Sequence, residues 1–590
     1  MSASQIIVLA TPVFLLLIAI EFAWGYAKGR NTYRLNDAIN SISLGVLSQL
    51  SAVFTRLLRI GIYTAIFSSV ALYPDPQFWN TWYGWVLAVL FYDLCYYWLH
   101  RMGHESAVLW AAHGVHHQSQ DYNLSTALRQ TSSGALLGWI FYVPMAIAGV
   151  PPLIFGIVAL IDLLYQFWVH TEHVPKLGWF DRWFCSPSNH RVHHAVNDQY
   201  LDKNYGGILV VWDRLFGSFQ VEGEKCVYGT RSGLNSWDPL WANFEIYWAL
   251  LKDSWRTRRW RDKVRVWFKP PGWRPADLVQ RFPKPEFDLM RVQRFHPAIS
   301  RAVAWFTALQ FVLLLAGVSV FLWFADSMPL APSFVWLAAL TVALWALGAV
   351  LQGRIGMLQV LLIESAALAT ASAAVGLVDL HHIFKPLTLL IALVFVSASQ
   401  RSTRADGRSD ALLLAALAAS LAGDVLLMLP GYFIPGLVAF LLAHLCYLVL
   451  FKLGTAQLQS VGAGTGREVA GMRSVWFPSR RALGLTLTIG AAIYAYLWHG
   501  LGPALRPAVA AYVLVIALMA AQAIGRATLL RNQAAVMVAV GAGFFMLSDT
   551  LLAINRFAHP LPLASLWVLS TYYCAQILIA FNACSERARG

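Results

Sequence analysis

The sequence predicts an all-α polytopic membrane protein with about fifteen transmembrane helices in two fused helical domains. The chain of 590 residues is 58% hydrophobic and only 13% charged. Apolar runs of roughly 20 residues, the length of a helix that crosses a bilayer, recur from one end of the chain to the other. Ten of the 16 histidines fall between residues 100 and 194, at spacings that suit helices.

The expected spans follow the apolar runs. The pair 132–150 and 152–170 has only Pro151 at its joint, so these two segments could equally form a shallow hairpin. The spans are residues 5–25, 43–70, 80–99, 132–150, 152–170, 301–325, 333–349, 356–378, 384–399, 411–429, 433–453, 481–500, 506–523, 532–553 and 562–583.

Basic residues set the expected orientation. Lys28, Arg30 and Arg34 lie between the first two spans, and Arg480 and Arg481 precede the twelfth. Fifteen spans with the N-terminus outside place every loop that has more than one basic residue in the cytoplasm. We therefore expect an integral protein of a bacterial inner membrane, and we attribute the net charge of +14 to loops that face anionic lipid.

The segment 170–300 is the one long polar stretch, and it holds twenty of the 44 Lys and Arg residues. Within it, Trp255–Arg261 mixes aromatic and basic side chains, as expected of a segment in the headgroup layer. We therefore expect no nucleic-acid partner.

Six cysteines show no pairing pattern, which indicates free thiols. They are Cys95, Cys185, Cys226, Cys446, Cys574 and Cys584. The oligomeric state is left open.

Four histidine motifs dominate the first half of the chain. They are H-R-M-G-H (100–104), H-G-V-H-H (113–117), H-T-E-H (170–173) and H-R-V-H-H (190–194). Residues three and four apart share a helix face, so each H-x-x-H-H triplet is expected to stack three imidazoles on one face. Eight or more imidazoles exceed the four ligands of a tetrahedral zinc, so two metal ions are the simplest count. The third and fifth spans end at these motifs, which predicts a cytoplasmic histidine-rich metal cap.

A dinuclear, all-imidazole site at a membrane face suggests oxygen activation on a lipid. Iron is the natural metal for inserting oxygen into an unactivated C–H bond. A hydrolytic two-metal site is the physical alternative, but it would more often carry bridging carboxylates.

The motifs resemble those of the fatty acid hydroxylase/sterol desaturase superfamily of membrane di-iron enzymes, and their flanks resemble the alkylglycerol monooxygenases within it. The resembling stretches are His100–Glu105, His116–Gln130, Tyr165–Glu172 and His190–Phe219. The resemblance implies two iron ions, tetrahydrobiopterin and molecular oxygen. It also implies hydroxylation of the carbon next to the ether oxygen of an alkylglycerol, followed by collapse to a fatty aldehyde and a glycerol derivative.

The resemblance also implies the site residues. Glu105, beside the first motif, takes the place of the family's acidic residue, and His170 could complete the shell of one metal. Whether His173 is a ligand and where the pterin binds are left open. The family's histidines correspond to His100, His104, His113, His116, His117, His190, His193 and His194.

The second half is almost entirely apolar helix, so its few acids stand out. Asp424 and Asp549 lie in spans that run in the same direction, each a turn or two from the same end. A carboxylate at membrane depth is a functional candidate by default. Two adjacent carboxyl groups resist double ionisation, which supplies one acid and one base. An interhelical hydrogen bond is the structural alternative, and Glu364 and His444 are further polar candidates.

This half resembles the lysoplasmalogenase-like family of eight-helix membrane proteins. The matching stretches are Phe384–Thr388, Ala422–Leu427, Phe440–Tyr447, Leu547–Phe557 and Thr571–Gln576. The resemblance implies hydrolysis of the vinyl ether of lysoplasmalogens, with Asp424 and Asp549 as the catalytic acids. We accordingly expect domains at 1–355 and 356–590.

The leading hypothesis is therefore a bifunctional membrane enzyme that cleaves ether lipids. A second hypothesis keeps the oxygenase but gives it a sterol, fatty acid or carotenoid substrate, with a non-catalytic C-terminal module. A metal transporter with a histidine-rich sensor is disfavoured, because the histidines keep fixed helical spacings instead of lying in a flexible tract.

Overall fold

The computed structural model describes residues 2–402, 407–453, 455 and 474–585. In these residues the chain is helical, and β-structure is limited to two isolated bridges, which confirms the all-α prediction. The chain forms two compact units: unit 1 is Met1–Met328 with Leu347–Ile355, and unit 2 is Pro329–Ala346 with Gly356–Gly590. Helix α16 (Leu330–Leu351) contributes to both units. The functional boundary at residues 355 and 356 stays a prediction.

Eleven of the described helices are long and apolar enough to cross a membrane. Each of the fifteen expected spans lies on helical residues, but the helices at four of them are too short or too polar to count among these eleven. The span at 132–150 is broken into α7, a 3-10 turn and α8, as expected for a shallow hairpin, and α9 has only 17 residues. Helix α4, which includes the span at 80–99, ends in polar histidine-motif residues, and α21 is also not among the eleven.

Unit 1 combines long apolar helices with a polar layer. Its helices are α1 (Ala3–Ala27), α2 (Leu35–Val70), α3 (Pro76–Trp79), α4 (Trp82–Glu105), α5 (Ala107–His117), α6 (Leu124–Ala127), α7 (Gly134–Gly138), η1 (Trp139–Tyr142), α8 (Val143–Ala148), α9 (Pro152–Trp168), η2 (Phe180–Arg182), α10 (Pro187–His194), η3 (Asp198–Tyr200), α11 (Val211–Leu215), α12 (Pro239–Arg256), α13 (Trp260–Phe268), α14 (Ala276–Arg281), η4 (Leu289–Arg291) and α15 (Arg301–Phe324).

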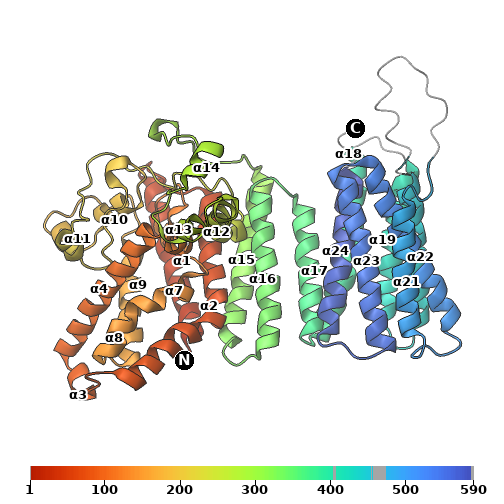
Figure 1. The fold of residues 1–590 in the computed structure, drawn as a ribbon, viewed down its shortest axis with the longest axis horizontal. Helices are drawn as coiled ribbons and strands as arrows, with labels where there is room; N and C mark the ends of the chain where they lie inside the picture. Colours follow the sequence, from red (N-terminus) through yellow and green to blue (C-terminus); the bar gives the residue numbers. More distant parts are fainter. Residues whose placement is uncertain (1, 403–406, 454, 456–473, 586–590) are drawn as a thin grey trace, which may run out of the picture. The chain divides into compact units, whose positions relative to one another are not determined.

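The long helices of unit 1 support the polar layer at one end. In the view of Figure 1, α12 to α14 lie at the upper end of the long helices, and α10 and α11 lie to their left, above α4. The C-terminal part of α1 reaches this layer, since Glu21 accepts hydrogen bonds from the Thr171 hydroxyl and the Leu124 amide. A helix of 25 residues is about 37 Å long. The N-terminus therefore lies at the opposite end of the unit from the polar layer.

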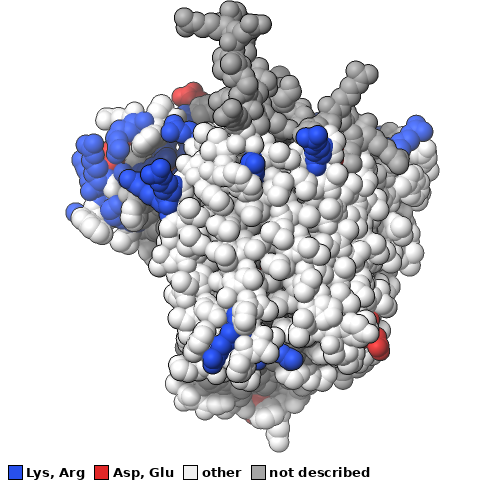
Figure 2. Space-filling view, turned by 90° about the vertical axis from the view of Figure 1, so that its right-hand side faces the viewer, with Lys and Arg blue, Asp and Glu red and all other residues white. Residues whose placement is uncertain are grey.

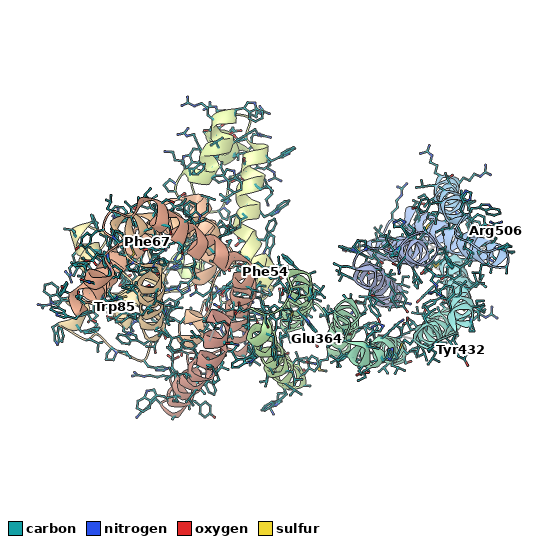
Figure 3. All side chains as sticks on the ribbon, turned by 90° about the horizontal axis from the view of Figure 1, so that it is seen from below. Phe54, Phe67, Trp85, Glu364, Tyr432 and Arg506 are labelled. Atoms are coloured by element: carbon teal, nitrogen blue, oxygen red, sulfur yellow. The ribbon has the colours of Figure 1, made fainter. Side chains whose placement is uncertain are left out.

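An aromatic and aliphatic core joins α2, α4, α8 and α9 below the polar layer. The Tyr63 and Phe155 rings stack with centroids 4.0 Å apart, and the Tyr63 hydroxyl donates to the Val150 carbonyl. Seen from below, Phe54 and Phe67 mark the course of α2 and Trp85 marks that of α4 (Figure 3). Stacked and edge-on aromatic pairs of this kind contribute about 0.5–1.5 kcal/mol beyond the area that they bury.

The outer surface of the polar layer is amphipathic. In α12 and α13, Trp255 and Trp260 are 85% and 81% exposed and Phe268 is 67% exposed, beside the basic residues of the same segment. Exposed tryptophans next to arginines suit the headgroup region of a membrane, and the location of this segment there stays a prediction.

Unit 2 contains the eight helices that the family resemblance implied. They are α17 (Met357–Ala374), α18 (Val378–Ser402), α19 (Gly407–Met428), α20 (Phe433–Leu453), α21 (Arg480–Leu497), α22 (Arg506–Leu530), α23 (Gln533–Phe557) and α24 (Ala564–Ser585).

Small residues let these helices pack closely. A Cβ on Gly541 of α23 would lie 3.1 Å from the Ala575 carbonyl of α24. Close backbone approach at small residues is the usual basis of helix association in lipid. The visible face of unit 2 is a broad uncharged band with Lys and Arg near its two ends (Figure 2). Tyr432 and Arg506 mark the lower end, which faces the viewer in Figure 3.

The cysteines agree with the prediction of free thiols. Cys95, Cys185 and Cys226 are buried, and they, Cys446 and Cys574 are unpaired. The side chain of Cys584 lies outside the described residues.

Substitution of Gly149, the residue that ends α8, tests how closely the chain packs at the joint between residues 132–150 and 152–170. Its φ is +101°, and a Cβ there would lie 2.3 Å from the Tyr73 carbonyl oxygen, which is fixed by a hydrogen bond from the Trp79 indole. We expect Gly149→Ala to cost about 2–5 kcal/mol, from the left-handed backbone plus displacement of Tyr73. Gly29→Ala is the matched control: its φ is +65° with open space around it, so we expect about 1–2 kcal/mol. Thermal unfolding in detergent compares the two, and equal losses would contradict the steric explanation.

Candidate functional site

Four elements of unit 1 bring nine histidines together. Helix α4 carries His100 and His104 on one face, and α5 and α10 each carry one H-x-x-H-H motif. His170 follows the end of α9. The elements converge at the polar layer because α4 and α9 both end there and α5 starts directly after α4.

The nine imidazoles divide into two groups. In each group the nitrogen atoms that could bind a metal all lie within 4.8 Å of one another. The five-histidine group is His100, His104, His113, His117 and His193. The four-histidine group is His116, His170, His190 and His194.

This division corrects the expectation that each triplet stacks three imidazoles on one face. His113 and His117, four residues apart on α5, join the five-histidine group, while His116 joins the other group. On α10 the pattern is reversed: the outer pair joins the four-histidine group and His193 joins the five-histidine group. Neighbouring residues on a helix point about 100° apart, so each H-H pair separates between two sites. Each of the two helices therefore supplies two imidazoles to one group and one imidazole to the other.

Short nitrogen-to-nitrogen distances run through both groups. In the five-histidine group the Nε2 atom of His113 lies 3.1 Å from that of His100 and 3.0 Å from that of His117. In the four-histidine group the Nε2 atom of His170 lies 3.1 Å from those of His116 and His190.

The contacts of the Nδ1 atoms, on the other side of each ring from Nε2, show which tautomer is present in three of the histidines. The Nδ1 atoms of His100, His116 and His170 lie 2.8, 2.9 and 2.8 Å from the carbonyl oxygens of Tyr205, Arg129 and Gln166. A carbonyl only accepts, so each Nδ1 carries the proton and each Nε2 of the neutral ring carries a lone pair. The Nε2 lone pairs of His116 and His170 therefore face each other. A cation between them removes this repulsion, so the donor set fits a metal ion, with carbonyls orienting the ligands.

Burial keeps these imidazoles neutral. It lowers the pKa of His113, His117 and His194 well below the ordinary value, and neighbouring imidazoles lower each pKa further. Burial likewise lowers the pKa of His116 to about 4. Neutral imidazole is the form that binds a metal, so at neutral pH no proton has to leave before binding.

Arg129 supports the four-histidine group, although sequence reasoning did not single it out. Its guanidinium is fully buried and donates to the Val115 carbonyl, the Asn40 side chain and the Gln118 side chain, at 2.8, 2.8 and 3.2 Å. Burial lowers the pKa of Arg129 to about 10. These bonds fix the loop whose carbonyl orients His116. The signal in the sequence was its place in the stretch His116–Gln130, which was quoted above for its resemblance.

Asp213 supports the five-histidine group by fixing a backbone segment whose carbonyl orients one of its histidines. Its carboxylate accepts from the Tyr205 and Gly206 amides at 2.7 and 2.8 Å, and from the Ser218 hydroxyl at 2.7 Å. It thereby fixes the Tyr205 carbonyl that orients His100. Asp213 belongs to a stretch quoted above for its resemblance, but its role depends on contacts that only the fold creates.

Glu105 lies at the surface instead of among the histidines. It is 41% exposed and forms an ion pair of 2.8 Å with Arg101. Arg101 also donates to the Tyr97 hydroxyl, which is bonded to Ser218 and so leads to Asp213. Among the described contacts, Glu105 therefore reaches the histidines through this chain of side chains. His173 belongs to neither group.

The two acids of unit 2 have different partners. Asp424 is 2% exposed, accepts from the Tyr572 hydroxyl at 2.7 Å and lies 3.6 Å from the Lys385 ammonium. Asp549 accepts from the Tyr512 hydroxyl at 2.6 Å, and its Oδ2 lies 3.7 Å from the Nε2 of His444. No hydrogen bond joins the two carboxylates in the described residues.

An apolar cavity lies against Asp549. Helices α20 to α23 enclose an empty volume of about 630 Å³, counted with its open mouth. Tyr512 and Asp549 are polar members of a lining that is otherwise mostly aliphatic and aromatic, and Asp424, His444 and Glu364 are outside that lining.

Known proteins resemble the two parts of the chain separately. The fatty acid hydroxylase family matches residues 85–218, and the YhhN family matches residues 380–583. Human alkylglycerol monooxygenase is 40% identical over 310 residues, 52% of this chain and 69% of the relative, and the zebrafish (Danio rerio) enzyme is 38% identical over 52% and 68%. The pig (Sus scrofa) lysoplasmalogenase TMEM86B is 37% identical over 201 residues, 34% of this chain and 73% of the relative. No solved structure matches.

The matches divide the chain in the same order as its motifs: the histidine motifs lie in the first matched region, and Asp424 and Asp549 lie in the second. The chain is an integral membrane protein that belongs, in its N-terminal part, to the alkylglycerol monooxygenase family of fatty acid hydroxylases and, in its C-terminal part, to the lysoplasmalogenase family of TMEM86B and YhhN.

Proposed function

We propose that this chain is a bifunctional enzyme that cleaves ether lipids. Unit 1 hydroxylates alkylglycerols with molecular oxygen, and unit 2 hydrolyses the vinyl ether of lysoplasmalogens. The observation that carries the first activity is the division of nine imidazoles into two groups, in each of which the possible ligand nitrogens lie within 4.8 Å of one another. The second activity rests on Asp549 in the wall of an apolar cavity.

Each histidine group would hold one iron ion. The family implies iron, and nine imidazoles exceed the ligands that one ion takes. Bound iron would supply the oxygen activation needed to hydroxylate the carbon next to the ether oxygen, and a tetrahydrobiopterin would supply electrons. The resulting hemiacetal collapses to a fatty aldehyde and a glycerol derivative.

The residues around the histidines hold them in place for this chemistry. The carbonyls of Tyr205 and Arg129 keep the protons of His100 and His116 on Nδ1, so that each Nε2 can bind metal. Asp213 and the Arg129 guanidinium hold those carbonyls. Glu105 stays a candidate for the acidic residue of the family, and its ion pair with Arg101 connects it to Asp213.

In unit 2, Asp424 and Asp549 are the proposed catalytic acids. Asp549 has no Lys or Arg partner in the described residues, which favours its neutral carboxyl form in an apolar wall. It can therefore protonate a vinyl ether. Asp424, paired with Lys385 and bonded to Tyr572, is the second acid that the family resemblance implies, and it lies outside the cavity lining.

The proposed location is a bacterial inner membrane, with the N-terminus outside and the histidine site at the cytoplasmic face. The C-terminal part of α1 contacts the polar layer, so the N-terminus and the histidines belong at opposite faces in either orientation. The basic residues of the layer favour the cytoplasmic side. The domains 1–355 and 356–590 would carry the two activities.

The division of adjacent histidines predicts a metal count. The wild-type protein should hold about two iron ions, and His193→Ala and His194→Ala should each leave about one, because these neighbours belong to different groups. Iron analysis of the purified protein and spectra of the remaining ion provide the measurement. His173→Ala is the matched control: His173 lies three residues from His170 but outside both groups, so this variant should keep both ions. A single tightly held zinc with full activity would refute the assignment.

The electron donor can be tested directly. Oxygen uptake on added alkylglycerol should require tetrahydrobiopterin and release one fatty aldehyde per substrate cleaved, as expected for hydroxylation next to the ether oxygen. Equal uptake with a sterol or a free fatty acid would favour the second hypothesis raised by the sequence. Unchanged cleavage with a ferredoxin donor and no pterin would exclude the pterin.

The two activities should be separable by mutation. Asp424→Asn and Asp549→Asn should each lower lysoplasmalogen hydrolysis by about 100-fold or more, while alkylglycerol oxidation stays unchanged because neither acid contacts the histidine groups. Conversely, His194→Ala should abolish oxidation and spare hydrolysis. Full hydrolysis by the double Asn variant would exclude these acids.

A further inference from the structure

His444 is a buried histidine of unit 2 that the acid pair does not use. It lies on α20 and is fully buried, and neither of its ring nitrogens has a hydrogen-bond partner among the described residues. A neutral imidazole carries one N–H and one lone pair. Leaving both unpaired in an apolar interior is costly, so this position points to a polar molecule that shares the site.

The surroundings of His444 direct it toward the cavity. Its Nε2 lies 3.7 Å from the Oδ2 of Asp549, and its ring packs edge-on against Tyr512 and Phe545, with centroids 5.4 and 4.7 Å apart. Tyr512 and Asp549 both line the cavity. His444 therefore lies next to Tyr512 and Asp549, the polar part of the cavity wall.

Asp424 is less suited than His444 to accept a proton from a water molecule in the cavity. It is ion-paired with Lys385 and bonded to Tyr572, whereas neither ring nitrogen of His444 has a hydrogen-bond partner among the described residues. The Nε2 atom of His444 lies 3.7 Å from Asp549, which lines the cavity. His444 is therefore the candidate base for a water molecule beside Asp549.

We propose that His444 is a further catalytic residue of unit 2, the general base that activates the hydrolytic water; this rests on the vinyl-ether hydrolysis proposed above. Asp549 gives its proton to the alkenyl carbon that is not bonded to oxygen, which leaves an oxocarbenium ion. Water adds to the carbon next to the oxygen, and its proton passes to the imidazole of His444. The product of this step is a hemiacetal.

The same two groups complete the turnover. The hemiacetal hydroxyl returns a proton to the Asp549 carboxylate as the carbon–oxygen bond to glycerol breaks. The His444 imidazolium protonates the departing glycerol oxygen. The sum is one vinyl ether and one water giving one fatty aldehyde and one alcohol, with both side chains in their starting forms. Tyr512, which donates to Asp549, keeps the carboxyl directed at the cavity.

Chemical rescue of the full-length protein tests the role of His444. We expect His444→Ala to lower the kcat of lysoplasmalogen hydrolysis by about 100-fold or more, with KM nearly unchanged. Added imidazole should restore a large part of the rate, whereas pyrazole, which has the same size and is a much weaker base, should not. His444→Asn, which fills more of the space but cannot act as a base, should show the same loss. His382→Ala, at an exposed histidine of α18, is the control and should keep the wild-type rate.

Alkylglycerol oxidation and the unfolding temperature of each variant show that the protein is intact. A rate within about threefold of wild type in either folded His444 variant would overturn the proposal. So would a loss that appears in KM alone or that pyrazole restores as well as imidazole does. Loss of hydrolysis in Asp549→Asn but not in His444→Ala would reject the role of His444 alone. A wild-type protein that never hydrolyses a vinyl ether would reject the function proposed for unit 2 and the role of His444 with it.

Discussion

The convergence of imidazole lone pairs is the constraint on which unit 1 depends. Carbonyls fix the protons of His100, His116 and His170 on Nδ1, so the Nε2 lone pairs of His116 and His170 face each other 3.1 Å apart. Such an arrangement is unfavourable without a cation and favourable with one. The buried Arg129 and Asp213 hold the carbonyls in place, and the long apolar helices hold the loops that carry them.

A different constraint acts on unit 2, because polar groups inside a bundle of membrane-spanning helices need hydrogen-bond or ionic partners. Asp424 is paired with Lys385 and Tyr572, and Asp549 with Tyr512. His444 has no hydrogen-bond partner for either ring nitrogen among the described residues. The exception lies beside the apolar cavity, where a reaction with water would need a base.

The two proposed reactions share a product type. Hydroxylation next to an ether oxygen and hydration of a vinyl ether both lead to a hemiacetal, and both hemiacetals collapse to a fatty aldehyde. The chemistries differ because an alkyl ether carries no basic carbon, so its C–H bond must be oxidised, whereas a vinyl ether accepts a proton directly. A metal centre of imidazoles and a carboxyl group in an apolar wall suit these two demands respectively.

The sequence alone determined the all-helical fold, most of the apolar spans and the histidines and acids that are candidates for the two sites, because hydrophobic length, helical spacing and motif type are local properties. It did not determine how the histidines divide. His116 and His117 are neighbours in the chain yet belong to different groups, since their side chains point in different directions and meet partners from α9 and α10. It also could not separate His170 from His173 or recognise the contacts of Arg129. Those outcomes depend on residues far apart in sequence, and only the tertiary structure places them in contact.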